Sequence, residues 1–310
     1  MKMKNLVTVS HGYYQPYFYW MFPIIVAKEE GYFQPAGINL EIHDIAPQGQ
    51  PVDKARWYEK ALENRSRDFY FCCAWQGIYS TSETGKGKIG AAIKSTLIKT
   101  FAIYTRSNTR INSVLDLVEK GVPIAVNKNA DAHYVTLKNL SELVPASKIK
   151  LAHLGGVERC FKALISGEVD AATLAGPYAE AAEAIGYRRL LPLARTEPTV
   201  VVFNESLGKQ TVASFLMAIN EAVHRINSER AKYKRRYVRE FEEVVARYLP
   251  ELKDSLKAIS SNLTLPVWAE AKILSKEEFD EIQGFLLNHG LSPQGRGYEA
   301  SVDAGLWMVQ

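Results

Sequence analysis

The sequence predicts an α/β fold in two lobes, and three observations predict it. Short apolar or alternating runs typical of strands alternate with helical patterns from the first residues onward, as in α/β chains with mainly parallel sheets. The same rhythm starts again after Ser107. In addition, a chain of 310 residues is long enough for two lobes, because domains usually contain about 100–200 residues. Two lobes predict a cleft between them.

The first block is expected to alternate strands with helices. Leu6–Ser10 alternates apolar and polar side chains as a strand does, and the apolar run from Pro23 predicts a helix that ends near Gly31. The elements expected next are a strand at 38–45, a helix at 51–68, a buried strand at 69–75 and a strand that reaches Ile93.

The second block repeats this rhythm. Helices are expected at 113–121, 130–143, 157–168 and 177–186, and strands at 122–127, 149–154 and 169–175. After about residue 210 the chain becomes strongly helical. Two such blocks joined by short extended segments imply a chain that leaves its first lobe, builds the second and returns.

Composition argues against two classes of function. A net charge of +4 is too small to indicate a nucleic-acid partner, and no run reaches the roughly 18 apolar residues of a membrane span. Basic residues gather between Arg225 and Phe241, where the spacing favours the solvated face of an amphipathic helix over a phosphate-binding patch. The three cysteines, with Cys72 and Cys73 adjacent, form no disulfide framework.

The motifs of metal and phosphate sites are missing. The six histidines show no H-x-x-H or H-E-x-x-H spacing, and the cysteines show no C-x-x-C. "GKGKIGAA" lacks the G-K-[ST] ending of a phosphate loop, and there is no serine nucleophile elbow. We therefore expect neither a metal nor a cofactor.

Two motifs carry a resemblance to a known family. They are K-E-x-G-Y-F-x-x-x-G-I at Lys28–Ile38 and A-L-x-x-G-E-V-D-A at Ala163–Ala171. Over nearly its whole length the chain resembles the solute-binding proteins for nitrate, sulfonates and taurine, whose relatives include the fungal thiamine-pyrimidine synthase and an aryl sulfinate desulfinase. Gly31, Gly37 and Gly167 are expected to end helices or make a tight turn, so the motifs identify the scaffold and leave the ligand open.

The resemblance implies a two-lobed fold like that of type II periplasmic binding proteins, with the ligand in the cleft. Lobe I is expected at 1–100 and 200–310, lobe II at 101–199, and hinge segments near 99–107 and 194–204. Open α/β sheets bind ligands beyond the carboxyl ends of their strands, so the strand ends predict the site. The ligand-binding residues expected there are His11, Tyr13, Tyr14, Gln15, Cys73, Trp75, Lys94, Ser95, Asn127, Asn129, His133, Gly156, Gly176 and Tyr178.

The aromatic residues among them suggest the kind of ligand. Rings from Tyr13, Tyr14 and Trp75 that converge on one cleft suit a planar aromatic or heteroaromatic solute, or a quaternary ammonium group. Phe18 and Phe22 stand at helical spacing and are expected in the core instead. Helix N-termini after Asn127 and Gly156 would serve an anionic group on the same ligand.

An enzyme on the same scaffold is the alternative. Cys73, His11 and His133 at strand ends would suit nucleophilic chemistry, but the desulfinase has its cysteine in the turn after the first strand, where this chain has "HGYYQP". What remains is a cytoplasmic cleft enzyme that uses His11 or His133 as acid or base, or a ligand sensor. No catalytic residue is assigned.

The favoured function is therefore solute binding. We expect a protein that clasps a small, aromatic organic solute and delivers it to an ABC-type permease if it is exported. "MKMK" leads directly into a strand, without the apolar core of a secretory leader. The expected location is cytoplasmic if Met1 is the native start, and periplasmic or extracellular if a leader has been removed.

Overall fold

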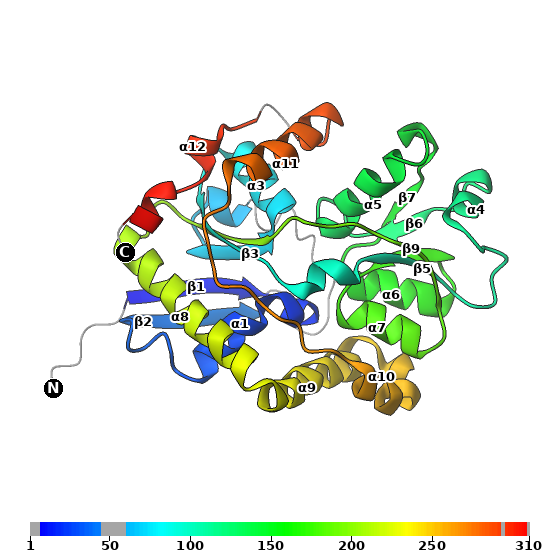
Figure 1. The fold of residues 1–310 in the computed structure, drawn as a ribbon, viewed down its shortest axis with the longest axis horizontal. Coiled ribbons are helices and arrows are strands. Elements are labelled where there is room, and N and C mark those ends of the chain that lie inside the picture. Colours follow the sequence, from blue (N-terminus) through cyan, green and yellow to red (C-terminus); the bar gives the residue numbers. More distant parts are fainter. Residues whose placement is uncertain (1–6, 45–59, 293–294, 309–310) are drawn as a thin grey trace.

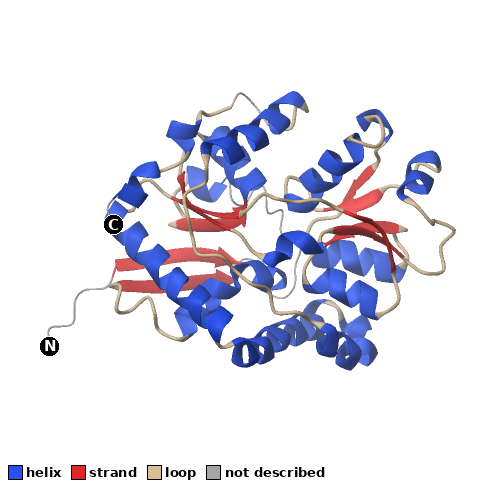
Figure 2. Ribbon diagram, viewed as in Figure 1, coloured by secondary structure: helices blue, strands red, loops and turns tan. Residues whose placement is uncertain are grey.

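The computed structural model describes residues 7–44, 60–292 and 295–308, and the ribbon forms two lobes (Figure 1). Within these residues there are three sheets, of two, three and five strands. Helices lie against the sheets of both lobes (Figure 2). The protein thus has the two-lobed α/β architecture that its sequence predicts.

Lobe I contains the two smaller sheets. β1 (Val7–Tyr13) and β2 (Ile38–Asp44) pair in parallel along their full length. In the second sheet β10 (Thr199–Phe203) lies between β3 (Phe69–Cys73) and β4 (Lys88–Ile93) and is antiparallel to both. Every residue of β3 and β10 is buried, so this sheet belongs to the core of lobe I.

Lobe II contains the five-stranded sheet. Its order is β7-β6-β8-β5-β9, and the strands are β5 (Ala102–Thr105), β6 (Ile124–Val126), β7 (Leu151–His153), β8 (Ala171–Leu174) and β9 (Arg188–Pro192). β6 is parallel to β7 and β8, whereas β5 is antiparallel to β8 and β9.

The strands nearest the lobe crossings are the antiparallel ones. β5 opens lobe II, and β10 is the first strand after the chain returns to lobe I. Each runs against both of its neighbours, so the three-stranded sheet has only antiparallel pairs and the five-stranded sheet is mixed, where the sequence analysis expects mainly parallel sheets. Both strands fall within the hinge segments expected near 99–107 and 194–204, whose role as hinges stays a prediction.

Helices cover the sheets. Those of lobe I are α1 (Phe18–Glu29), α3 (Ala74–Thr84), α8 (Lys209–Ser228), α11 (Lys276–Asn288) and α12 (Tyr298–Ser301). Those of lobe II are α4 (Val114–Glu119), α5 (Asp131–Ser141), α6 (Val157–Ser166) and α7 (Pro177–Ala184). The short 3-10 helices are η1 (Gln15–Tyr17), η3 (Thr96–Thr100), η4 (Ala146–Lys148), η5 (Pro250–Ser255) and η6 (Ala304–Met308).

Two further helices connect the lobes from below. α9 (Arg230–Tyr248) and α10 (Leu256–Asn262) run from beneath lobe I toward lobe II (Figure 1). α10 packs on α7, although its residues fall in the range that the sequence analysis assigns to lobe I. Burial of Tyr237 and Phe241 gives α9 an apolar inner face, and Arg235 and Arg239 are exposed, which confirms the amphipathic helix expected there.

The motif glycines act as their positions predict. Gly31 and Gly37 have φ values of 77° and 76°, and Gly167, at the end of α6, has a φ of 82°. Side chains rarely adopt this left-handed conformation, so glycine ends these helices and makes the turn into β2 at low cost. The expectation that these are scaffold residues is confirmed.

Three expected elements differ from the structure. β1 continues beyond Ser10 to Tyr13 because β2 pairs with it over its whole length. α3 begins at Ala74, inside the strand expected at 69–75, and its serines, threonines and glycine gave no helical pattern. Residues 51–59, half of the helix expected at 51–68, lie outside the described residues, and only residues 60–63 are seen as helix.

α1 is buried on all sides. Phe18 and Phe22 are fully buried, as predicted for core residues. The other residues from Tyr19 to Ala27 are buried as well. The helix packs on α8, α9 and β3, which places an aromatic stretch at the centre of the molecule. Among the described helices, none is long and apolar enough to cross a membrane.

Candidate functional site

A pocket lies between the lobes, where the end of β1, η1, α1, the end of β3 and the start of α3 face the start of α5. The side chains of lobe I that define it include Tyr14, Tyr17, Trp20, Phe71, Cys73 and Gln76. Lobe II contributes Ala130 and Asp131. The cavity measures about 30 Å³, which is room for a water molecule or two. The two lobes contact each other beside it, through hydrogen bonds of Tyr14 and Tyr17 and the Trp75–Tyr134 ring stack.

Four aromatic residues contribute to the wall. Tyr14, which the sequence analysis expects at the site, does line the pocket. Tyr17 and Trp20 stand three residues apart, so η1 and α1 turn both toward the pocket, while Phe18 and Phe22 face the core. Phe71, at the centre of β3, completes the wall.

Three neighbours of Tyr14 do not line the pocket. His11 is fully buried and stacks on Phe69 at 4.4 Å; its ring nitrogens lie 3.0 Å from the carbonyl of Phe69 and 3.1 Å from Met21 Sδ. It is a core histidine because β1 continues through it. Tyr13 is half-buried, and its hydroxyl lies 3.5 Å from the Gln15 carbonyl. The Gln15 amide points outward to α9, where Nε2 donates to Glu243 at 3.3 Å.

The start of α3 contributes a thiol and an amide. Cys73 caps the helix, and its sulfur accepts a weak hydrogen bond from the Gln76 N–H at 3.4 Å. Gln76 is only 3% exposed and lines the pocket with Cys73. Cys73 is thus brought to the pocket as expected, and Gln76 joins it from the first turn of the helix.

Trp75 lies at the lobe boundary but outside the pocket. Because α3 begins at Ala74, the helical turn directs this side chain away from Cys73 and Gln76. Its indole is fully buried and stacks on Tyr134 of α5, with ring centroids 5.2 Å apart and 13° between planes. The ring expected to hold a ligand instead joins the two lobes.

The residues before α5 form a compact turn. Asn129 has a φ of 54°, and its N–H donates to His133 Nδ1 at 3.2 Å. His133 stacks on Tyr134 and meets His153 edge-on at 5.0 Å. Burial, reinforced by His153 and Lys128, lowers the pKa of His133 to about 4. Neither Asn129 nor His133 lines the pocket, and His133 is neutral at physiological pH.

The hydroxyl of Tyr17 connects the lobes. It accepts hydrogen bonds from Asn127 Nδ2 at 2.9 Å and from the Val157 N–H at 3.2 Å. The second donor belongs to the first turn of α6, which Gly156 caps. Thus Asn127 and the N-terminus after Gly156, both expected to bind ligand, hold a side chain of lobe I instead.

A buried carboxylate lies beside this contact. Glu158, in the first turn of α6, is 3% exposed and accepts a hydrogen bond from the Tyr14 hydroxyl at 2.8 Å. Burial and the neighbouring Glu158 charge raise the pKa of Tyr14, so its hydroxyl stays protonated. A Cβ at Gly156 would lie within about 2.1 Å of this carboxylate, so glycine is needed for Glu158 to take its place.

Gly176 and Tyr178 contact lobe I at another point. The Tyr178 hydroxyl donates to the Pro16 carbonyl at 2.7 Å, and the Gly176 N–H donates to Thr100 Oγ1 at 2.7 Å. Gly176 has a φ of 56°, and a Cβ there would lie 2.8 Å from the Tyr19 ring. Both residues thus lie at the lobe boundary, outside the pocket.

Lys94 and Ser95 lie elsewhere in lobe I. The Lys94 ammonium pairs with Glu278 of α11 at 2.6 Å. Ser95 is buried where its backbone bridges to Trp268. Neither residue lines the pocket.

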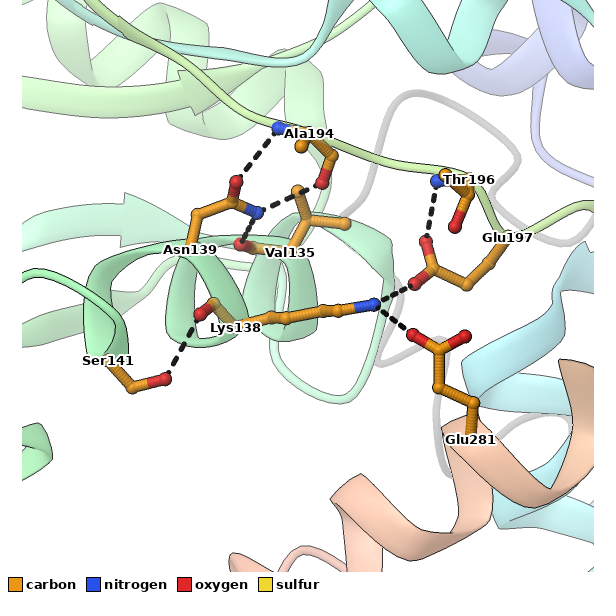
Figure 3. A network of polar contacts seen from close by, with 8 residues as sticks. All are labelled: Val135, Lys138, Asn139, Ser141, Ala194, Thr196, Glu197 and Glu281. Carbon is orange, nitrogen blue, oxygen red and sulfur yellow. Dashed lines mark hydrogen bonds and ion pairs between the residues drawn. The ribbon is translucent and has the colours of Figure 1, made fainter.

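A polar network connects α5 to the returning segment and to α11 (Figure 3). Lys138 donates to Glu197 and to Glu281, each at 2.8 Å. Asn139 exchanges hydrogen bonds with the backbone of Ala194, at 2.8 and 3.0 Å. Glu197 is 4% exposed, so Lys138 neutralises a buried charge while it joins lobe II to α11 of lobe I.

Several pocket residues were not predicted. The sequence analysis placed Tyr17 and Trp20 in the helix expected in the core. The spacing of three residues from Tyr14 to Tyr17 and from Tyr17 to Trp20 could have indicated that all three rings share one face. Asp131, in the first turn of α5, follows the strand end at Asn127, where the sequence analysis expects the cleft, but it was not named among the ligand-binding residues. The described residues contain no group of three or more His, Cys, Asp and Glu that would hold a metal ion.

Comparison with known proteins adds a family match. A family model described as "NMT1/THI5 like" matches residues 20–233. A search of curated proteins finds no match. The family model covers the pocket wall from Trp20, all of lobe II, all of α8 and the start of α9.

Solved structures of similar fold cover almost the whole chain. The alkanesulfonate-binding protein SsuA from Xanthomonas axonopodis pv. citri, bound to MOPS, has a TM-score of 0.71 at 16% identity, over 96% of this chain and 97% of that one. The periplasmic aliphatic sulphonate binding protein SsuA from Escherichia coli has a TM-score of 0.70 at 16% identity, over 96% and 92%. A DszB mutant in complex with biphenyl-2-sulfinic acid has a TM-score of 0.56 at 15% identity, over 98% of each chain.

Proposed function

The chain belongs to the NMT1/THI5-like family, and from that premise we propose that it is a solute-binding protein that closes its two lobes on a small, ring-bearing organic solute. The likeness in fold to sulfonate-binding proteins supports the solute-binding role. An ABC-type permease is the partner that this role requires. The proposal differs from those proteins in the kind of ligand.

The aromatic wall of the interlobe pocket is the observation that carries the proposal. Tyr14, Tyr17, Trp20 and Phe71 come from three separate elements and meet at one place. Rings gathered this way offer flat apolar surface at little cost in side-chain entropy, which suits an aromatic or heteroaromatic ligand. A small inorganic anion needs little such wall.

Binding requires the lobes to separate first. Pockets that hold small organic ligands usually measure about 300–1,000 Å³, far more than the 30 Å³ of the closed pocket. The segments around β5 and β10 carry the chain between the lobes, so a rotation there would open the pocket without disturbing either core. The interlobe contacts of Tyr17, Trp75 and Lys138 would break when the lobes open and form again when they close.

A cleft enzyme is the second candidate. It is favoured by Cys72 and Cys73, which both line the pocket, and by the likeness in fold to DszB. Steady turnover of any ring compound by the purified protein, lost in Cys73→Ser, would favour this candidate over solute binding.

A ligand screen tests the proposal. Aromatic acids, pyrimidines, sulfonates and quaternary amines are screened by thermal shift, because a ligand at 100 times its Kd adds about 2.7 kcal/mol to the free energy of unfolding. Each hit is then titrated calorimetrically against wild type and Trp20→Leu. We expect Trp20→Leu to weaken binding by about 1 kcal/mol or more.

A matched control keeps this result specific. Phe285 of α11 is half-buried and packs on the Trp75 ring outside the pocket. Phe285→Leu removes an aromatic ring that does not line the pocket and is expected to leave the affinity unchanged. Hits confined to inorganic anions, or equal affinity in wild type and Trp20→Leu, would refute a ring-binding pocket.

A further inference from the structure

A second cavity lies at the boundary of the lobes, apart from the interlobe pocket. Its walls come from η3, which precedes the crossing into lobe II, from α7 and α9, and from the segment after α10 that runs back to lobe I (Figure 1). It shares no lining residue with the interlobe pocket. Its volume is about 200 Å³, below the roughly 300 Å³ at which pockets for drug-sized molecules begin. The cavity therefore has room for a small ligand.

Hydrogen bonds tie the walls of this cavity together. Thr100 Oγ1 accepts from the Gly176 N–H at 2.7 Å, which joins η3 to the start of α7. The Thr264 N–H donates to the two carboxylate oxygens of Glu180 at 3.2 and 3.1 Å, which joins α7 to the segment after α10. That segment returns to η3 through Thr96 Oγ1, which accepts a backbone N–H at 3.0 Å. The cavity is thus enclosed by walls that support one another.

The hydroxyl of Tyr237 is a buried polar group at this cavity. Tyr237 lines the cavity and is fully buried, and its hydroxyl has no hydrogen-bond partner among the described residues. Its ring packs on Phe18 and Phe22, with centroids 5.0 and 5.3 Å away. Burial raises the pKa of Tyr237 well above its ordinary value, and the charge of Glu180 is the next cause, so the hydroxyl lies on the Glu180 side of the ring. A ligand in the cavity would supply the partner that a buried hydroxyl requires.

Two side chains of opposite charge also line the cavity, and neither forms an ion pair within the described part of the chain. The Glu180 carboxylate is half-buried, and burial raises its pKa, because the hydrogen bond from Thr264 does not fully compensate its charge. Lys99 is exposed, and its ammonium has no acceptor among the described residues. A ligand that carries one charge of each sign would pair with both side chains.

We propose that this cavity binds a small zwitterion of the amino-acid type, whose ammonium group donates to Glu180 and to the Tyr237 hydroxyl and whose carboxylate pairs with Lys99. An ammonium group has three donors, so it serves both oxygen acceptors at once. This site is independent of the ligand in the interlobe pocket. Because its walls belong to elements on both sides of the crossing, the bound zwitterion contacts both lobes.

A series of amino acids of increasing length tests the proposal. Glycine, β-alanine, 4-aminobutanoate and 5-aminopentanoate differ in the separation of their two charges, and each is titrated calorimetrically beside the amine and the acid that lack the second charge. We expect the best-fitting member to bind about 10- to 100-fold more tightly than either single-charge analogue, the range for hydrogen bonds to charged groups. Equal or tighter binding of an analogue, or no binding by any member, overturns the proposal.

Variants assign the binding to the three side chains. Glu180→Gln keeps an oxygen for the Thr264 N–H but loses the charge, so it is expected to weaken the zwitterion about 10- to 100-fold. Lys99→Met is expected to remove the advantage of the zwitterion over the amine. Tyr237→Phe is expected to weaken binding about 3- to 10-fold and to keep its free energy of unfolding, because its hydroxyl has no partner to lose. Unchanged affinity in both Glu180→Gln and Tyr237→Phe overturns the proposal.

Glu183→Gln is the matched control. Glu183 stands on the same helix, pairs with Arg189 at 3.4 Å and does not line the cavity. We expect Glu183→Gln to leave the affinity for the zwitterion unchanged. A loss of binding in Trp20→Leu but not in Glu180→Gln would place the zwitterion in the interlobe pocket and overturn the proposal.

Discussion

The indole of Trp75 lies parallel to the ring of Tyr134, with centroids 5.2 Å apart, and the two belong to different lobes. This stacked pair is one of several contacts between the lobes, which include the Tyr17 hydroxyl, the Tyr14–Glu158 hydrogen bond and the Lys138–Glu281 ion pair. They are among the contacts that the proposed opening of the lobes would break.

The Trp75 and Tyr134 rings are expected to stabilise each other. We predict that Trp75→Leu, Tyr134→Leu and the double variant give a coupling of about 1 kcal/mol in a double-mutant cycle, as stacked aromatic pairs do. The measurement is the free energy of unfolding in urea. Additive effects of the two substitutions would mean that the rings contribute only through their separate contacts.

Tyr17→Phe is expected to loosen the lobes. Removal of the hydroxyl leaves Asn127 Nδ2 and the Val157 N–H without their acceptor, at a cost of about 1–3 kcal/mol to the closed state. Small-angle X-ray scattering should show a larger radius of gyration. Tyr298→Phe is the control, because its hydroxyl donates to the Leu274 carbonyl within lobe I at 2.7 Å. An equal increase in both variants contradicts the assignment.

Lys138→Met is expected to cost more stability than Glu281→Gln. Lys138 compensates Glu197, which is 4% exposed, whereas the Glu281 side chain is 61% exposed. We expect a loss of about 2–3 kcal/mol for Lys138→Met and below about 1 kcal/mol for Glu281→Gln. Chemical denaturation of the two variants at pH 7 measures both, and similar losses would place the main contact at Glu281.

The same ion pair predicts a pH dependence. Burial would raise the pKa of Glu197, but the Lys138 hydrogen bond and charge outweigh it and lower that pKa below its ordinary value of 4.5. Since the folded pKa is the lower one, this stabilisation is complete above about pH 4.5 and is lost as the pH falls through the folded value. Lys138→Met should remove this acid-sensitive part of the unfolding free energy.

The low pKa of His133 predicts a second pH dependence of the free energy of unfolding, at higher pH than that of Glu197. Its pKa is about 4 in the folded state and ordinarily 6.5, so between these values the unfolded chain binds a proton that the folded chain does not. Stability therefore falls as the pH drops from 6.5 to 4, by about 3 kcal/mol. In His133→Gln this slope should be absent. A slope that persists in the variant would assign it to other groups.

Much of the scaffold could be predicted because its signals are local. Gly31, Gly37 and Gly167 need a left-handed backbone, and their spacing from apolar runs marks helix ends and a turn. The alternation of strands and helices likewise follows from patterns of a few residues. The antiparallel course of β5 and β10 could not be predicted, because it depends on where the chain re-enters each lobe.

The site was predicted less well, because small shifts of an element redirect its side chains. β1 continues from Ser10 to Tyr13, so His11 stays in a strand and in the core. α3 begins at Ala74, so its first turn directs Trp75 away from Cys73. Tyr14 and Cys73 line the pocket because they stand where those elements end.

The most direct test of solute binding between moving lobes is the distance between two spin labels, one on each lobe. Leu143, after α5, and Leu287, in α11, are both exposed, and the three native cysteines are buried. With labels at Leu143→Cys and Leu287→Cys, we predict a broad distance distribution that narrows to its shortest component when the best-binding ring compound is added, and no such change in Trp20→Leu at the same concentration. A distribution that is identical with and without the compound, although calorimetry shows it bound, would contradict closure of the lobes on a solute.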